Sequence, residues 1–217
     1  MIKDYLKLCL VTHAEAMPFS LYKKLILQAI AGGVTLVQLR EKSKNLIQLR
    51  EMAIELKTLL QPFKIPLIIN DHLEIAKEID ADGIHLGQSD LSPIEARKLL
   101  GPTKIIGWSV ETLEQLIIAN QLSCIDYIAA SAVFQSQTKA NCKTIWGLDG
   151  LQKITAQSKH PVIAIGGINQ HNIRDVIDSG ASGAAVISAI HCQDNPKEAT
   201  IHLITKINQS IERRKYA

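Results

Sequence analysis

The chain has 217 residues, of which 47% are hydrophobic, and its 24 basic and 21 acidic residues give a formal net charge of +3. These charges are dispersed, so neither a nucleic-acid surface nor a surface for anionic lipid is indicated. No segment approaches the roughly 18 apolar residues of a membrane span, and the N-terminal residues do not resemble a cleaved signal. We therefore expect a soluble, cytoplasmic protein of one domain, residues 1–217, with neither nucleic acid nor a membrane as its partner.

Four cysteines occur, at Cys9, Cys124, Cys142 and Cys192, and no two of them form a C-x-x-C pair. Neither a zinc cluster nor a dithiol redox motif is therefore indicated. A disulfide framework is also not expected in a chain of this size. We predict free thiols in a reducing compartment.

Short β-branched runs alternate with amphipathic stretches along the whole chain, which is typical of repeated βα units with a parallel sheet. Strands are predicted at residues 7–12, 34–40, 65–70, 83–86, 104–108, 125–130, 162–165 and 183–187. Eight right-handed crossovers bring the first and last strands together, so the predicted fold is α/β, a single (β/α)₈ TIM barrel. An open doubly wound sheet is the alternative, although no dinucleotide-binding or P-loop glycine motif follows any strand.

Helix ends carry clear local signals. Ser92 and Asn195 each precede a proline and, three residues on, a glutamate, as expected of an N-cap with proline at the first helical position. Thr112 and Gln115 form a weaker capping box. Gly180 stands where a left-handed residue would end the helix before the last strand. These signals support the alternation of strands and helices.

Catalytic residues of this fold lie at the carboxyl ends of strands, and polar residues do gather there. After the second strand, Gln38, Arg40 and Lys42 alternate, so two cations and an amide face one side and can bind a polyanion. A solvated, charged strand end is the alternative. The third strand ends in Asn70-Asp71.

Asp71 and Asp90 follow neighbouring predicted strands, the third and the fourth. Mg²⁺ prefers oxygen ligands and often keeps water and substrate phosphate in its remaining positions, so the two carboxylates can share this ion. The alternatives are that Asp71 caps the helix starting near Leu73 and that Asp90 is an ordinary turn residue.

Later strand ends add hydroxyls, glycines and a long loop. Ser109 ends the fifth strand, unless it is a plain helix-entry serine, and the polar loop 134–146 has the length of a lid or binding loop. Gly166-Gly167 and Ile187-Ser188 follow the last two strands, where this fold commonly holds a phosphate. His85 is interpreted as a hydrogen-bonded mouth histidine rather than a base.

In order and spacing, these motifs resemble the thiamine phosphate synthase family over nearly the whole chain. The motifs are Gln38-x-Arg40-x-Lys42, Asn70-Asp71, His85-Leu86-Gly87-Gln88-x-Asp90, Gly107-x-Ser109, Thr138-Lys139, Gly147-Leu148, Ala164-Ile165-Gly166-Gly167-Ile168 and Val186-Ile187-Ser188-Ala189-Ile190. The resemblance implies a transferase of thiamine biosynthesis. Such an enzyme joins 4-amino-2-methyl-5-hydroxymethylpyrimidine diphosphate to a thiazole phosphate, or its carboxylate form, and releases pyrophosphate.

The resemblance also implies roles for individual residues. Asp71 and Asp90 would hold Mg²⁺, and Gln38 would contact the aminopyrimidine. The residues around the diphosphate oxygens would be Arg40, Lys42, Asn70, Ser109 and Lys139, of which all but Asn70 are expected to be catalytic. The residues around the thiazole phosphate would be Ser136, Thr138, Gly167, Ile187 and Ser188.

The chain departs from the family pattern around its sixth strand. Ser131-Ala132 and Gln135-Ser136 stand where the family commonly has glycine-proline and proline-threonine, so the match to the family is weakest on the thiazole side. Glu111 replaces a histidine that looks catalytic in the sister thiazole tautomerases. A tautomerase-like isomerase and a non-catalytic binder of thiamine intermediates are the alternative functions. A monomer and a homo-oligomer are the alternatives for the assembly.

Overall fold

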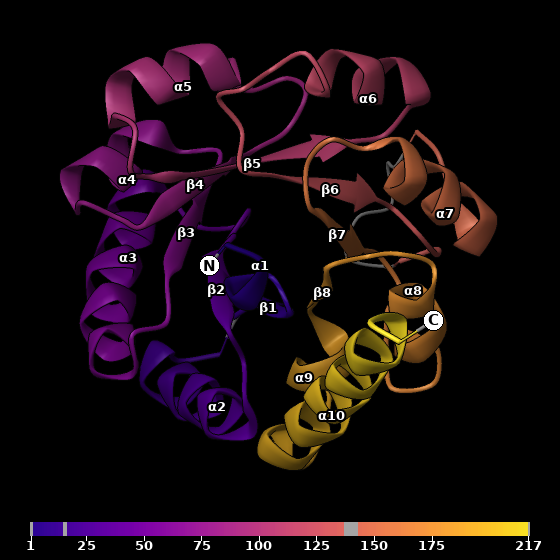
Figure 1. Ribbon diagram of the computed structural model, residues 1–217. Coiled ribbons are helices and arrows are strands. Elements are labelled where there is room, and N and C mark those ends of the chain that lie inside the picture. Colours follow the sequence, from indigo (N-terminus) through magenta and orange to yellow (C-terminus); the bar gives the residue numbers. More distant parts are fainter. Residues whose placement is uncertain (1, 15–16, 137–142, 217) are drawn as a thin grey trace.

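The computed structural model describes residues 2–14, 17–136 and 143–216 of the chain. Eight parallel strands form a closed barrel in which each strand pairs with its neighbours in chain order and β8 pairs with β1 (Figure 1). The strands are β1 (Leu8–Val11), β2 (Leu36–Leu39), β3 (Leu67–Asn70), β4 (Gly83–Leu86), β5 (Ile105–Val110), β6 (Tyr127–Ser131), β7 (Val162–Ile165) and β8 (Gly183–Val186). The predicted (β/α)₈ barrel is confirmed.

All eight predicted strands are present, and the strands predicted at 83–86 and 162–165 have the predicted bounds. The strand predicted at 34–40 begins two residues later, at Leu36. The reason is local, because the N–H of Val34 bonds to the carbonyl of Ala29 and so belongs to the end of the preceding helix.

Helices surround the barrel, and a short one lies at the N-terminal end of its strands (Figure 1). They are α1 (Ile2–Tyr5), α2 (Phe19–Gly32), α3 (Leu46–Leu60), the 3₁₀ turn η1 (Gln61–Phe63), α4 (Leu73–Glu78), α5 (Pro93–Leu100), α6 (Leu113–Ala119), α7 (Gly147–Gln157), α8 (Ile173–Asp178), α9 (Ser188–His191) and α10 (Pro196–Arg214). Ile2 of α1 and the following Leu6 pack against the residues inside the barrel, so this end is filled by apolar side chains.

The predicted helix ends are confirmed. Ser92 and Asn195 each accept a hydrogen bond from the backbone N–H of the glutamate three residues later. Thr112 and Gln115 form both bonds of a capping box, in which each side chain accepts a backbone N–H of the other residue. Gly180 has φ = 100°, which a residue with a Cβ adopts only under strain.

Two apolar layers hold the barrel together. The interior is filled by side chains that include Leu36, Ile68 and Ile163, and a larger layer lies between the strands and the surrounding helices. The barrel interior is thus closely packed around these residues.

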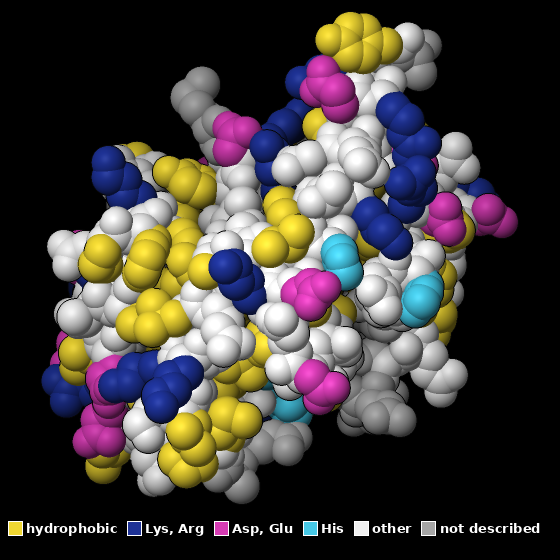
Figure 2. All heavy atoms as spheres, turned by 90° about the horizontal axis from the view of Figure 1, so that it is seen from below, with side chains coloured by type: hydrophobic (Ala, Val, Ile, Leu, Met, Phe, Trp, Pro, Cys, Tyr) yellow, Lys and Arg dark blue, Asp and Glu magenta, His cyan; other side chains and the backbone are white. Residues whose placement is uncertain are grey.

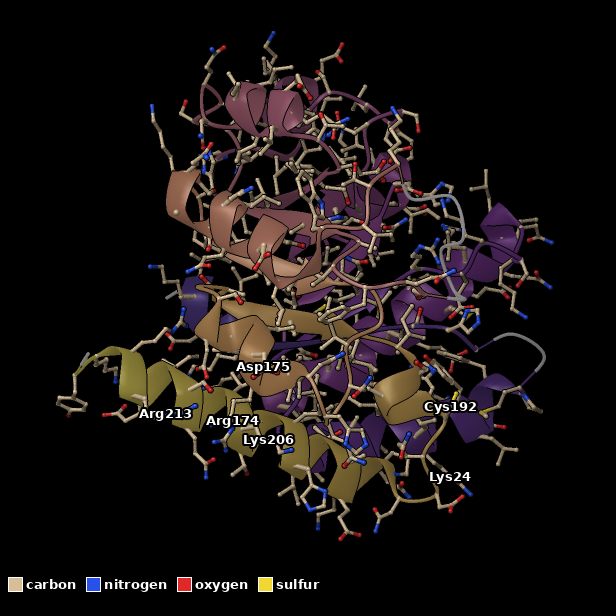
Figure 3. The ribbon with its side chains drawn as sticks, turned by 90° about the vertical axis from the view of Figure 1, so that its right-hand side faces the viewer. Lys24, Arg174, Asp175, Cys192, Lys206 and Arg213 are labelled. Atoms are coloured by element: carbon tan, nitrogen blue, oxygen red, sulfur yellow. The ribbon has the colours of Figure 1, made fainter. Side chains whose placement is uncertain are left out.

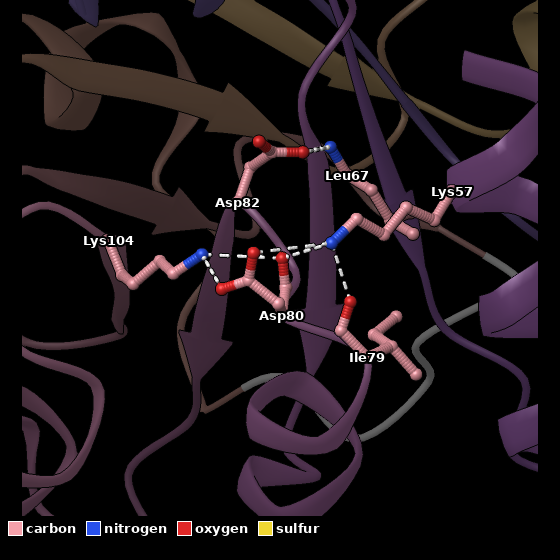
Figure 4. A network of polar contacts seen from close by, with 6 residues as sticks. All are labelled: Lys57, Leu67, Ile79, Asp80, Asp82 and Lys104. Carbon is pink, nitrogen blue, oxygen red and sulfur yellow. Dashed lines mark hydrogen bonds and ion pairs between the residues drawn. The ribbon is translucent and has the colours of Figure 1, made fainter. Parts of the chain in front are cut away.

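A polar network lies at the N-terminal end of the strands (Figure 4). Lys57 and Lys104 both pair with Asp80, which lies in the turn before β4, and Lys57 also donates to the carbonyl of Ile79. Asp82 accepts the N–H of Leu67 at 2.8 Å and so joins this turn to β3. The Asp80 side chain is 77% exposed, and exposed ion pairs contribute little to stability.

The outer surface mixes charges of both signs with apolar side chains. Figure 2 shows the face formed by α2, α3 and α10, whose exposed apolar residues include Leu21 and Ile54. Arg174, Asp175, Lys206 and Arg213 lie on the neighbouring helices α8 and α10 (Figure 3). In the described ranges, no helix is long and apolar enough to cross a bilayer.

Three of the four cysteines fall within the described ranges. Cys9, Cys124 and Cys192 are free thiols, as predicted. Cys142 lies outside the described residues.

We expect Ile68→Ala to lower the free energy of unfolding by about 2–5 kcal/mol, because it removes a fully buried side chain from the barrel interior. Urea denaturation followed by circular dichroism measures this. The matched control is Ile47→Ala, since the Ile47 side chain is 71% exposed and its loss should change stability by less than about 0.5 kcal/mol. Equal effects of the two substitutions would contradict a close-packed interior.

Candidate active site

A cavity of about 380 Å³ opens at the carboxyl ends of the strands. Its polar lining comes from the ends of β2 to β6 and from the loops that follow. The polar side chains are Gln38, Arg40, Lys42, Asn70, Asp71, His85, Gln88, Ser89, Asp90, Ser109, Glu111, Tyr127, Ser131 and Lys143. The structure thus brings together every described residue predicted for the pyrimidine and diphosphate.

The end of β2 supplies two cations and an amide to this cavity. Gln38, Arg40 and Lys42 all line it, as their alternation predicts. Gln38 is buried, whereas Lys42 is exposed, so the solvent exposure of the lining increases from Gln38 to Lys42. The backbone is held by Thr12, whose Oγ1 accepts the N–H of Arg40 at 2.9 Å. The predicted polar face is therefore confirmed.

Two carboxylates and a lysine meet on the neighbouring side of the cavity. Nζ of Lys42 donates to Oδ2 of Asp71 at 2.5 Å, and Asp90 Oδ2 accepts the N–H of Gly87 at 2.7 Å. Burial raises the pKa of Asp71, but hydrogen bonds from Lys42 and Asp90 outweigh it, and the net pKa is lowered. Burial and the hydrogen bond with Asp71 raise the pKa of Asp90. The two carboxyl groups are thus close enough to share one proton or one cation.

Of the two alternatives for these aspartates, one is wrong. Asp71 does not cap α4, because the N-cap is His72, which makes no side-chain capping bond. Asp90 is indeed a turn residue, since it accepts the N–H of Gly87. That turn also places its carboxylate beside Asp71, so a turn residue and a metal ligand are not exclusive roles, and the metal role stays a prediction.

A hydrogen-bonded chain runs across the floor of the cavity. His85 bonds through Nδ1 to the hydroxyl of Tyr127 at 3.0 Å and through Nε2 to Oγ of Ser109 at 2.9 Å. Tyr127 also bonds to the Gln38 side chain, and burial raises the pKa of its phenol, which therefore stays neutral. This series of hydrogen bonds thus connects β2, β6, β4 and β5. His85 is a hydrogen-bonded histidine, as interpreted from the sequence.

Tyr127 is a site residue that the sequence interpretation missed. Its strand was predicted, and the two-residue period of that strand directs Tyr127 and Ala129 inward, which is the signal that could have found it. Gly107 makes room for it, since a Cβ at that position would lie 2.1 Å from Cζ of Tyr127. Lys143, from the end of the long loop, was also missed.

A second, smaller cavity of about 60 Å³ adjoins the first. It brings together Ser136, Gly167, Ile187 and Ser188, which are the described residues predicted for the thiazole phosphate. The two cavities share Arg40 and three further residues, namely Ser131, Ile165 and Ala185. Ligands in the two cavities would therefore be neighbours.

Glycine is required at the rim of this second cavity. Gly167 has φ = 64°, and a Cβ there would lie 2.6 Å from the carbonyl oxygen of Gln135. A larger residue would therefore displace the loop after β6. The predicted site residues Thr138 and Lys139 lie outside the described residues.

Comparisons with known proteins agree with this geometry. A profile of the family described as thiamine monophosphate synthase matches residues 8–190. The thiamine-phosphate synthase of Chlamydia caviae is 43% identical over 200 residues, which cover 92% of this chain and 94% of that protein. That of Vibrio parahaemolyticus is 45% identical over 183 residues, covering 84% and 89% of the two chains.

Solved structures are similar as well. The thiamine phosphate pyrophosphorylase of Pyrococcus furiosus superposes with a TM-score of 0.87 at 32% identity, covering 97% of this chain and 100% of that one. A 3-hexulose-6-phosphate synthase matches with a TM-score of 0.69 at 17% identity over 92% and 99% of the chains, which shows the shared fold alone. Fold, matched residues and identity together show that the chain belongs to the thiamine monophosphate synthase family.

Proposed function

We propose that the chain condenses 4-amino-2-methyl-5-hydroxymethylpyrimidine diphosphate with 4-methyl-5-(2-phosphoethyl)thiazole to give thiamine phosphate and pyrophosphate, or with the carboxylate form of the thiazole to give the same products and CO₂. One observation carries this proposal. The larger cavity is lined by the paired carboxylates together with Arg40 and Lys42. The smaller cavity beside it has glycines at its rim and is also lined by Arg40. The relatives named thiamine-phosphate synthase, which align over most of their length, support it.

Asp71 and Asp90 fit a Mg²⁺ site. Their carboxyl groups lie within hydrogen-bond reach of each other. Burial and the neighbouring carboxylate of Asp71 raise the pKa of Asp90. A bound cation would relieve the repulsion between the two carboxylates. Mg²⁺ is usually held by one or two carboxylates together with water and substrate phosphate. The described residues contain no group of three or more side chains suited to a metal, so water and the diphosphate would complete the coordination. The ion would neutralise charge that develops on the departing diphosphate.

Cationic and polar side chains bind the diphosphate oxygens in this proposal. The guanidinium of Arg40 suits two oxygens at once, and Lys42 adds a point charge. Asn70 and Ser109 donate hydrogen bonds from the same cavity. Lys139 is proposed for the same role from the loop after β6.

The reaction needs no protein nucleophile. The carbon–oxygen bond to the diphosphate breaks with its electron pair leaving on pyrophosphate, and the electron-rich aminopyrimidine carries the positive charge. The lone pair of the thiazole nitrogen then forms the new carbon–nitrogen bond. Preorganised charges that stabilise the leaving group supply the catalysis, a role that suits Arg40 and Lys42 of the cavity lining.

Each substrate ring has its own part of the mouth. Gln38 is buried beside Tyr127 and offers its amide to the aminopyrimidine. Ser136, Gly167, Ile187 and Ser188 are proposed to bind the thiazole phosphate in the second cavity. Thr138, which lies outside the described residues, is proposed for the same role. Because the cavities share residues, the thiazole nitrogen can reach the pyrimidine carbon.

We further propose that the enzyme acts on small phosphorylated molecules in the cytoplasm. The free thiols of Cys9, Cys124 and Cys192 suit a reducing compartment. A homo-oligomer is compatible with the exposed apolar residues of α2 and α3.

The first test is pyrophosphate release by the purified chain with pyrimidine diphosphate, thiazole phosphate and Mg²⁺, each omitted in turn. Release is expected only when all three are present, because bond breakage and attack use both substrates and the metal. A coupled phosphate assay measures it. A folded chain that binds thiazole phosphate without releasing pyrophosphate would instead be a binder or a tautomerase-like isomerase.

Asp90→Ala should reduce Mg²⁺-dependent turnover by at least about 100-fold, the scale of losing one group that stabilises developing charge. It should also abolish the rise in melting temperature that Mg²⁺ with pyrophosphate causes in the wild type. Circular dichroism should show an intact fold, because Asp90 lies in a mouth loop.

The control for this substitution is Asp175→Ala, on the exposed outer face of α8 (Figure 3). This variant should keep both the activity and the response to Mg²⁺. Near-normal activity of Asp90→Ala would refute the metal assignment.

Tyr127→Phe should lower turnover by about 10-fold, because His85 loses the partner of its Nδ1 and Ser109 is held less firmly. Loss of a buried hydrogen bond should also cost about 1–3 kcal/mol of stability. Nitrogen NMR of the His85 imidazole should report a changed tautomer balance. The control is Tyr216→Phe, at a tyrosine that is 83% exposed. An unchanged His85 signal in Tyr127→Phe would contradict the series of hydrogen bonds through His85.

A further inference from the structure

A buried polar cluster lies behind the barrel mouth, between β1, α2 and α9. Tyr22, in the first turn of α2, is fully buried, and its hydroxyl accepts the N–H of His13 at 2.9 Å. The same hydroxyl lies 3.1 Å from Nε2 of His191, the last residue of α9. Figure 3 labels Cys192, which directly follows this turn. Neither Tyr22 nor His191 is among the described residues that line the two cavities.

The side chains of Tyr22 and His191 are neutral, and both bond to the backbone of His13. His13 belongs to residues 12–14, which we call the β1 extension. Burial lowers the pKa of His191 to about 4, although a hydrogen bond with the backbone of His13 opposes the shift. Burial likewise raises the pKa of the Tyr22 phenol. At neutral pH the hydroxyl can therefore donate to Nε2 of His191 while it accepts the N–H of His13.

The other edge of the β1 extension is bonded to the end of β2. Thr12 donates its N–H to the carbonyl of Gln38 at 2.8 Å and accepts the N–H of Arg40 at 2.9 Å. Ala14 donates its N–H to Oε1 of the buried Glu41 at 2.9 Å. The β1 extension thus connects the strand end that carries Arg40 with the Tyr22–His191 pair.

His191, one member of this pair, lies at the opposite end of the helical turn that begins with Ser188. Helix α9 has only four residues, so Ser188 at its start and His191 at its end belong to one turn and move together. Ser188, Ile187 and Arg40 line the second cavity. The position of Ser188 relative to Arg40 in that cavity therefore depends on where His191 is held.

We propose that Tyr22 and His191 are positioning residues for the thiazole-phosphate half of the site. They hold α9 against the β1 extension and so fix Ser188 relative to Arg40 in the second cavity, while neither Tyr22 nor His191 contacts a substrate. The inference rests on the proposed function, because it assigns the second cavity to the thiazole phosphate.

Tyr22→Phe tests this by removing a single oxygen atom. The KM for thiazole phosphate should rise about 10-fold, equivalent to about 1.4 kcal/mol, while kcat and the KM for pyrimidine diphosphate stay unchanged. Calorimetric titration with thiazole phosphate alone should show the same loss of affinity. Tyr216→Phe is the matched control and should leave all three quantities as in the wild type.

A second pair of variants separates positioning from folding. His191→Gln keeps an amide within reach of the Tyr22 hydroxyl and should restore near-normal affinity, whereas His191→Leu should weaken thiazole phosphate binding as Tyr22→Phe does. Melting temperatures establish that each variant is folded. A purely structural pair would lower the melting temperature and leave both KM values unchanged, which would overturn the proposal.

The failures of the two proposals are distinguishable. If the wild type turns over and folded Tyr22→Phe shows unchanged KM values, or equal rises for both substrates, the positioning role is wrong and the proposed function stands. If the wild type releases no pyrophosphate, the proposed function is wrong. The positioning role is then judged by calorimetry, where weaker binding of thiazole phosphate by Tyr22→Phe supports it and equal binding overturns it.

Discussion

Closure of the barrel through the pairing of β8 with β1 is the constraint on which the site depends. Leu8, Cys9 and Leu10 pair in parallel with Ala184, Ala185 and Val186, which lie at the opposite end of the chain. This pairing places the ends of β7 and β8 beside β1 and β2. Without it, the glycine-rimmed cavity and the cations of β2 would lie at opposite edges of an open sheet and could not share Arg40.

The mouth separates a charged rim from a neutral floor. Asp71, Asp90 and Lys42 stand near solvent, where charges can exchange partners as a polyanion arrives. Below them, His85 and Tyr127 form a buried chain whose polar atoms have partners within the protein. Burial makes charge costly on the floor, so its groups are neutral and hydrogen-bonded, while the charged side chains are confined to the rim.

Packing inside the barrel explains why the small residues stand where they do. Gly107 leaves space for the Tyr127 ring, and Gly167 lets the loop after β6 approach the loop after β7. The first makes room for the floor of the larger cavity, and the second forms the rim of the smaller cavity. Both glycines belong to motifs found in the sequence, but the atoms that exclude a Cβ come from distant strands and loops.

Local patterns in the sequence determined the eight strands, the helix caps at Ser92 and Asn195, and the inward alternation of Gln38, Arg40 and Lys42. Each depends on residues close in the chain, through the two-residue period of a strand or the bonds of a first helical turn. The order of the motifs also indicated the family. Only the tertiary structure decided that Asp90 turns toward Asp71, that Tyr127 joins His85 to Gln38, and that the Tyr22 hydroxyl joins the backbone of His13 to His191. These contacts join residues far apart in the sequence, and they exist because a closed barrel brings all eight strand ends to one mouth.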